Sequence, residues 1–303
     1  MFRAFYDPGY YYRLPEGHSF PMGKFAKAAE IISTECKDIS VAPIPSFPEE
    51  VLREVHPESY LRKLISGSLD EDEIYRMGLP WRGELFQRSF LEVRGTLAAA
   101  DAAIEDGLGF NLAGGTHHAF PDRAQGFCVL NDVAVAIHSI WRSFPDWRIL
   151  ILDTDAHQGN ANHYIFRDHP LVYTFSIHVA RNFPTVKEPG CLDVGLERWV
   201  DGDTYLAALR QALDRIHGEF HPHLIFWVTG VDVHECDRFG QMKLTTEDMS
   251  LRNRIVAEWC QDMDVPTAVV YGGGYHQEPE MTAQLHAMTT QEIAAIFSGT
   301  IRG

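Results

Sequence analysis

Short apolar runs alternate along the chain with segments in which apolar residues recur every three or four positions. The runs predict strands, and the three-and-four spacing predicts amphipathic helices. Because several runs are apolar at almost every position, they are typical of parallel strands that are covered on both faces. The pattern therefore predicts an α/β fold with a mostly parallel central sheet and helices on both of its faces. The predicted strands are Arg3–Tyr6, Gly109–Leu112, Arg148–Asp153, Leu171–Ile177, Leu224–Thr229 and Thr267–Tyr271.

Helical spacing is clear in three segments. The first runs from Phe86 to Ile104 and the second from Leu206 to Ile216, and the third starts at a capping box of Thr245 and Asp248. Two segments rich in acidic residues, proline or glycine, Gly67–Gly83 and Arg181–Gly195, are predicted to be surface loops. Loops at the ligand end of such a sheet often shape substrate entry.

Composition limits the class of protein. The 303 residues, of which 45% are hydrophobic, can build one large core, so we expect a single domain over residues 1–303. The five cysteines form no CxxC pair, which favours a reducing compartment. No apolar run reaches the roughly 18 residues of a membrane span, and the N-terminus does not resemble a signal peptide. We therefore expect a cytoplasmic protein without membrane contact.

The formal net charge of −16 opposes nonspecific binding to nucleic acid. It mildly favours cationic substrates, although solubility explains the same charge.

The strongest chemical signal is Asp153-Thr154-Asp155-Ala156-His157, directly after a predicted buried strand. Strand periodicity places residues 153, 155 and 157 on one side of the chain. Ligands of parallel sheets bind beyond the carboxyl ends of the strands. Two carboxylates and an imidazole in one place indicate a divalent metal, although an acidic loop that caps a helix remains an alternative.

Three further clusters follow predicted strands. Two adjacent histidines end the glycine-containing segment Ala113–His118, which favours catalysis over a core role. The segment Thr229–Asp237 supplies more carboxylates, one of which could complete a metal shell. Glycines in Tyr271–Tyr275 could direct the Tyr275 phenol into the same crevice, or could simply form a flexible loop.

Together these motifs make the chain resemble the zinc-dependent histone deacetylase family, closest to its class IV and bacterial members. The resemblance extends over most of the sequence in the family's order. It implies the arginase/deacetylase type of three-layer α/β fold and an amide hydrolase acting on acylated amines. The matching stretches are Leu14–His18, Phe20–Met22, Val55–Leu61, Gly114–Phe120, Gly126–Asp132, Asp153–Asn160, Phe175–His178, Asp232–Asp237 and Gly272–Tyr275.

The resemblance implies that Asp155, His157 and Asp237 bind one zinc ion. It also implies that His118 is the general base toward zinc-bound water and that His117 assists it. Asp153 would orient His117 from behind, as outer-shell partners of catalytic histidines do.

The resemblance assigns further residues to the substrate. Tyr275 would donate a hydrogen bond to the carbonyl oxygen as it gains negative charge. Phe127 and Phe183 would form the walls of an acyl-lysine tunnel, with ordinary core packing as the alternative. The Gly126 carbonyl would accept a hydrogen bond from the substrate amide.

The family also implies a monovalent cation, expected to be potassium, beside the zinc. Its predicted ligands are the Asp153 carboxylate and backbone oxygens that include those of Asp155, His157 and Ser176.

The sequence departs from many class I members at Asn160, where they carry aspartate. A neutral amide stabilises imidazolium less than a carboxylate does, so we expect His118 to be a weaker base that is more easily neutral. Ala161 replaces the usual glycine, and nothing in the sequence explains this.

Two other functions share parts of this pattern. A ureohydrolase of the same fold would need a further aspartate where this chain has Gly159. A noncatalytic acyl-lysine binder would not need both histidines and Tyr275. The predicted substrates are acylated lysine in peptides or proteins and, as an alternative, acetylated polyamines. The sequence does not determine the preferred acyl group or the oligomeric state.

Overall fold

The computed structural model describes residues 1–299, so the last four residues of the predicted domain lie outside the described residues. Within this part of the chain, eight parallel strands form one sheet in the order β2-β1-β3-β8-β7-β4-β5-β6. The predicted parallel α/β fold is confirmed. The strands are β1 (Phe2–Phe5), β2 (Ile39–Ala42), β3 (Leu108–Asn111), β4 (Ile149–Asp153), β5 (Val172–Val179), β6 (Leu192–Leu196), β7 (Leu224–Thr229) and β8 (Thr267–Tyr271).

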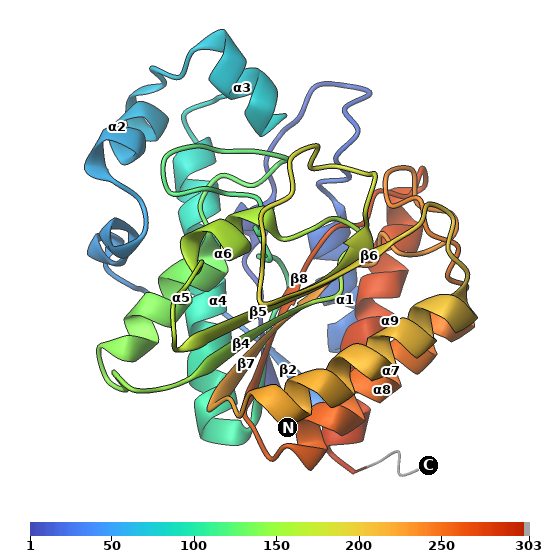
Figure 1. The fold of residues 1–303 in the computed structure, drawn as a ribbon. Coiled ribbons are helices and arrows are strands. Elements are labelled where there is room, and N and C mark those ends of the chain that lie inside the picture. The colour runs from blue at the N-terminus through green and yellow to red at the C-terminus, as the bar shows by residue number, and fades with distance from the viewer. Residues whose placement is uncertain (300–303) are drawn as a thin grey trace.

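Helices cover both faces of this sheet. Helices α1, α7, α8 and α9 lie on one face, and α4 and α5 pack together on the other (Figure 1). The α-helices are α1 (Lys24–Glu35), α2 (Glu58–Ser66), α3 (Glu71–Met77), α4 (Leu85–Asp106), α5 (Asp132–Trp141), α6 (Asn160–Ile165), α7 (Gly202–Glu219), α8 (Thr246–Asp262) and α9 (Pro279–Phe297). Two short 3₁₀ helices, Pro8–Tyr10 and Glu49–Glu54, precede α1 and α2.

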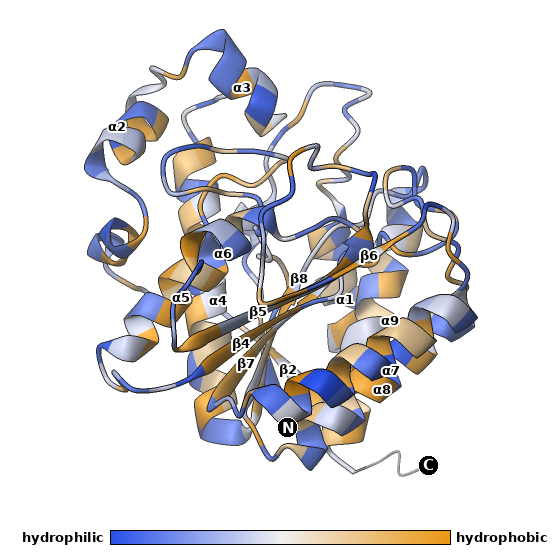
Figure 2. Ribbon diagram, in the orientation of Figure 1, coloured by the Kyte–Doolittle hydropathy of each residue, from blue (hydrophilic) through white to orange (hydrophobic). Residues whose placement is uncertain are grey.

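The central strands are apolar because both of their faces are buried. Every residue of β4, β7 and β8 is buried, and Figure 2 shows the central strands as the most hydrophobic part of the ribbon. Strand β4 pairs with β5 and β7, so that Asp153 at its end lies opposite Ser176 and Val228. The carboxyl ends of the central strands therefore meet at one edge of the sheet.

Both predicted surface loops contain regular structure. Residues 71–77 form α3, which begins at a capping box where Asp70 and Glu73 exchange side-chain and backbone hydrogen bonds. Residues 192–196 form the edge strand β6. The loop predictions were wrong there because a seven-residue helix and an edge strand bury too few residues to give a clear hydrophobic period. The capping box predicted at Thr245 and Asp248 is confirmed.

None of the helices in residues 1–299 is long and apolar enough to cross a membrane.

Candidate active site

Two loops at the carboxyl edge of the sheet bring a buried group of metal-binding side chains together. Asp155 and His157 follow β4, and Asp232 follows the neighbouring strand β7. One ligand atom from each of the three lies within 4.8 Å of the others, and all three side chains are buried. His157 Nδ1 lies 3.1 Å from Asp155 Oδ1 and 2.8 Å from Asp232 Oδ2.

The structure groups Asp232 with Asp155 and His157, and the predicted ligand Asp237 lies five residues further along the same loop, where its binding of zinc stays a prediction. Both oxygens of the Asp237 carboxylate accept backbone N–H groups, as both oxygens of Asp155 also do. Oδ1 accepts those of Phe239 and Gly240 at 2.8 and 2.9 Å, and Oδ2 accepts that of Tyr275 at 2.6 Å. Asp237 thus fixes the Tyr275 loop to the loop after β7, while Asp232, nearer to the strand end, faces Asp155 and His157.

The donor set of Asp155, His157 and Asp232 fits a zinc ion. Two carboxylates and one imidazole are ligands of catalytic zinc sites, which keep further positions open. Burial, followed by the Asp155 charge, raises the pKa of Asp232 to about 7. Burial opposes the charged form of His157, but Asp232 and Asp155 outweigh it and raise the pKa of His157 well above its ordinary value. The pocket thus concentrates negative charge that a divalent cation would neutralise.

The two adjacent histidines have different partners. His117 Nδ1 lies 2.7 Å from Asp153 Oδ2, and His118 Nδ1 lies 2.7 Å from Asn160 Oδ1. Burial disfavours the His117 imidazolium, but the Asp153 carboxylate outweighs it and raises the pKa of His117 to about 9. Burial and the neighbouring His117 charge lower the pKa of His118 well below its ordinary value. The pair therefore combines a charged and a neutral imidazole.

Tyr275 lies beside the metal-binding group and is surrounded by aromatic rings. Its ring centroid is 5.8 Å from that of Phe127, 5.2 Å from that of Phe239 and 6.4 Å from that of His157. Desolvation, followed by the Asp155 charge, raises the pKa of Tyr275 well above its ordinary value. The phenol therefore keeps its proton and can donate a hydrogen bond.

Lys24, at the start of α1, supports the Tyr275 loop from within the protein. Its ammonium group donates to the carbonyl oxygens of Gly272 and Gly274 at 3.2 and 3.4 Å. It also lies 5.4 Å from the centroid of the Tyr275 ring. No sequence pattern reveals the role of Lys24, because Lys24 and Gly272 are 248 positions apart and helical spacing does not mark a buried lysine as functional.

A cavity of about 430 Å³ leads from the surface to these groups. Gly126, Phe127 and Phe183 line it, together with His118, His157 and Tyr275. Gly126 and Phe127 adopt positive φ angles of 54° and 68°. A Cβ atom on Gly126 would lie 2.7 Å from the Phe183 ring and 2.9 Å from the His118 ring, so the glycine allows the wall to approach His118.

The predicted monovalent-cation residues lie directly behind the metal-binding group. Ser176 is paired with Asp153 in the sheet register and is fully buried. The Asp153 carboxylate accepts the backbone N–H of Asp155 at 3.0 Å through Oδ1 and contacts His117 through Oδ2. A potassium ion at this place stays a prediction.

Comparison with known proteins identifies the family of this chain. The histone deacetylase domain family matches residues 19–293. An uncharacterized protein of Picosynechococcus is 39% identical over 279 residues, covering 90% of this chain and 92% of its own. The acetoin utilization protein AcuC of Bacillus subtilis is 30% identical over 301 residues, covering 89% of this chain and 76% of its own.

Solved structures share the fold at low identity. A crystal structure of a histone deacetylase homologue from Aquifex aeolicus has a TM-score of 0.80 at 22% identity, covering 98% of this chain and 83% of that one. An acetylpolyamine aminohydrolase from Burkholderia pseudomallei has a TM-score of 0.77 at 21% identity, with full coverage of both chains.

The fold and the site define an amide hydrolase of the arginase/deacetylase type. The chain belongs to the histone deacetylase family.

Proposed function

We propose that this protein is a zinc-dependent deacetylase that removes an acyl group from the side-chain amine of lysine, with acetylated polyamines as the alternative substrate. One observation carries the proposal. The buried donor set of Asp155, His157 and Asp232 lies beside a neutral histidine, a charged histidine and a protonated tyrosine. One cavity reaches His157, His118 and Tyr275 from the surface.

Asp155, His157 and Asp232 would hold the zinc ion. When bound, zinc supplies Lewis acidity toward the substrate carbonyl and toward water. The matched residues also support potassium as a second, structural ion near Asp153 and Ser176.

His118 acts as the general base in this proposal. Because its imidazole is neutral, His118 can accept the proton of the attacking water and later return it to the departing amine. The Asp153 carboxylate keeps the His117 imidazole charged, and this positive charge stabilises the negative charge that develops on the substrate carbonyl oxygen. Asn160 orients His118 without adding a carboxylate that would raise its basicity.

Tyr275 donates its phenolic proton in a hydrogen bond to the developing oxyanion. Gly126, Phe127 and Phe183 enclose the substrate stem. The stem is an uncharged chain of methylene groups, which suits an apolar wall.

The proposal is tested with the variant Tyr275→Phe. We expect its turnover of an acetyl-lysine peptide to fall by roughly 10²- to 10³-fold, as happens when other oxyanion donors are lost. Zinc content, measured by elemental analysis, should equal that of the unchanged protein. Equal acetate release by both proteins would remove Tyr275 from the reaction, and tight peptide binding without product in the unchanged protein would favour a noncatalytic binder.

Gly159 argues against a ureohydrolase, which would need an aspartate at this position. A Cβ atom there would lie 2.4 Å from Asp153 Oδ2, so the further aspartate of a two-metal site has no room. Within residues 1–299, one group of three or more clustered ligand side chains is found. Membership of class IV, a cytoplasmic location, a single domain and the absence of nucleic-acid partners stay predictions.

A further inference from the structure

Helix α3 forms part of the entrance to the cavity. Tyr75 and Arg76 line the cavity, and both are exposed, Tyr75 by 87%. The carbonyl oxygen of Arg76 accepts the backbone N–H of Gly126 at 3.0 Å, and that of Met77 accepts the N–H of Phe127 at 2.8 Å. The end of α3 is thereby fastened to the wall that would grip the substrate, which holds Arg76 at the entrance.

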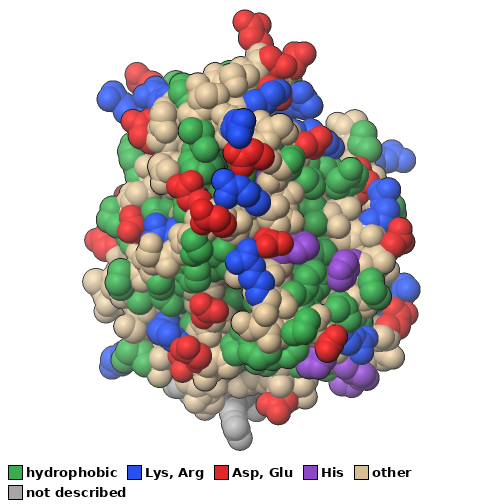
Figure 3. Space-filling model, turned by 90° about the vertical axis from the view of Figure 1, so that its left-hand side faces the viewer, with side chains coloured by type: hydrophobic (Ala, Val, Ile, Leu, Met, Phe, Trp, Pro, Cys, Tyr) green, Lys and Arg blue, Asp and Glu red, His purple; other side chains and the backbone are tan. Residues whose placement is uncertain are grey.

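The acidic run on α3 is not available to a substrate in the cavity. Asp70 and Glu73 form the capping box, and Glu73 also accepts a hydrogen bond from Lys63 at 2.7 Å. Glu71 and Asp72 are exposed but do not line the cavity. In Figure 3, acidic side chains project at the top of the molecule, the height at which Figure 1 places α3.

The charge at the entrance is positive. Among the described residues that line the cavity there is no Asp or Glu, and Arg76 is its one Lys or Arg. The Arg76 side chain donates through Nε to the carbonyl oxygen of Asp72 at 3.3 Å and has no ion-pair partner in residues 1–299. Its two terminal nitrogens are thus left for a ligand.

A second arginine reinforces this charge. Arg238 is next to the lining residue Phe239, and its guanidinium donates to the carbonyl oxygens of Tyr275 and Ser19, both at 2.6 Å. Like Arg76, it forms no ion pair within the described part of the chain.

We propose that Arg76 on α3 is a specificity-determining residue that selects acyl-lysine flanked by neutral or acidic residues and disfavours cationic substrates, both acetylated polyamines and lysine-rich tails. The proposal rests on the proposed deacetylase function and chooses among its substrates. When an acyl-lysine occupies the cavity, the residues that flank it in the peptide lie at the entrance beside Arg76. When an acylpolyamine occupies the cavity, its free ammonium groups lie there.

The overall charge of −16 acts in the opposite direction, but over a longer range. At physiological ionic strength the field of distant surface charges is screened within about 8 Å, whereas a substrate group at the entrance meets Arg76 directly. The local charge therefore decides discrimination between bound substrates, and the net charge contributes to encounter rates at low salt.

The experiment compares kcat/KM of the zinc-loaded protein on three substrates at about 0.15 M salt. They are an acetyl-lysine peptide with aspartate and glutamate flanks, the same peptide with lysine and arginine flanks, and N8-acetylspermidine. The variants are Arg76→Gln and Arg76→Glu. The control is Arg210→Glu, which makes the same charge change at an exposed position of α7 that does not line the cavity.

The unchanged protein should prefer the acidic peptide by roughly fivefold or more for each charge that meets Arg76. Arg76→Gln should reduce this preference, and Arg76→Glu should invert it toward the basic peptide and N8-acetylspermidine. Arg210→Glu should leave the ratio unchanged.

Two results would overturn the proposal: a preference of the unchanged protein for either cationic substrate, or equal shifts from Arg76→Glu and Arg210→Glu. Failure to release acetate from all three substrates would instead refute the proposed deacetylase function.

Discussion

The floor of the cavity and its entrance are built in contrasting ways. At the floor, Asp155, His157 and Asp232 follow central strands directly and are buried. Their carboxylates also accept backbone N–H groups, as Asp155 does from Gly273 and Asp232 from Ala156. At the entrance, Tyr75, Arg76 and Phe183 are exposed side chains on a short helix and a loop.

This difference separates chemistry from selection. Groups at strand ends are held by a sheet whose strands are buried on both faces, so their positions tolerate little change. Side chains at the entrance are attached through only a few hydrogen bonds, and their replacement changes which molecules enter without disturbing the floor. Changes at the floor should therefore abolish the reaction, and changes at the entrance should redirect it.

The largest effect is expected from single substitutions of Asp232 and Asp237, which lie in one loop. Asp232→Ala removes a metal ligand, so zinc content and deacetylation should both be lost. Asp237→Ala should leave Asp155, His157 and Asp232 in place but free the Tyr275 loop, so we expect turnover to fall by roughly 10- to 100-fold with zinc retained, as for other outer partners of metal sites. Elemental analysis and acetate release measure both. Loss of zinc from Asp237→Ala alone would restore Asp237 as the ligand.

A smaller effect is expected at Lys24, which lies behind the floor. Lys24→Met removes two hydrogen bonds from a charged donor to the Tyr275 loop, so kcat should fall by about tenfold or more with unchanged zinc content. Lys24→Arg should restore part of the loss.

The pH profile gives an independent check on Lys24. Burial lowers the pKa of Lys24 to about 8. The advantage of the unchanged protein over Lys24→Met should therefore shrink as pH rises through about 8, where the lysine loses its charge. Equal kcat values in both proteins below pH 8 would contradict the positioning role.

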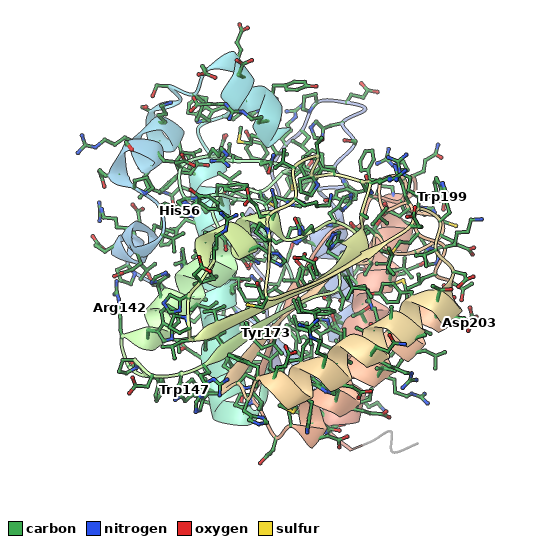
Figure 4. The ribbon with its side chains drawn as sticks, in the orientation of Figure 1. His56, Arg142, Trp147, Tyr173, Trp199 and Asp203 are labelled. Carbon is green, nitrogen blue, oxygen red and sulfur yellow. The ribbon has the colours of Figure 1, made fainter. Side chains whose placement is uncertain are left out.

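The smallest effect on activity is expected at His56, which lies just before α2 and does not line the cavity (Figure 4). Its Nδ1 donates to the carbonyl oxygen of Pro121 at 2.9 Å, and its Nε2 accepts the N–H of Asn131 at 2.9 Å. Both bonds require the neutral ring, and burial lowers the pKa of His56 from 6.5 to about 4.

Because the unfolded chain binds a proton at His56 before the folded one does, the free energy of unfolding should decrease as pH falls from 6.5 to about 4. The contribution of this one group is about 3 kcal/mol. His56→Gln should flatten the pH dependence by that amount in urea unfolding, and the exposed control His221→Gln should not. Parallel pH curves for the unchanged protein and His56→Gln would refute this assignment.

Much of the fold could be predicted from the sequence, and the reason is burial. The run Ile149–Asp153 is apolar because both faces of β4 are covered, and the helix Leu85–Asp106 carries a clear apolar stripe because one face packs on the sheet. The predicted boundaries of β4, β7 and β8 differ from those observed by at most one residue. Helix α3 and strand β6 were missed because they are short and each contains only one buried residue.

For the site, the sequence by itself determined that Asp155 and His157 follow a buried strand and that histidine and glycine clusters follow its neighbours. Only the tertiary structure shows that Asp232 lies beside Asp155 and His157, because the loop after β7 has no periodicity that fixes where each carboxylate points. The same holds for Lys24 and Arg76. The partners of these two residues come from distant segments, and the charge at the cavity entrance depends on which side chains the folded chain places there, not on the total charge of the sequence.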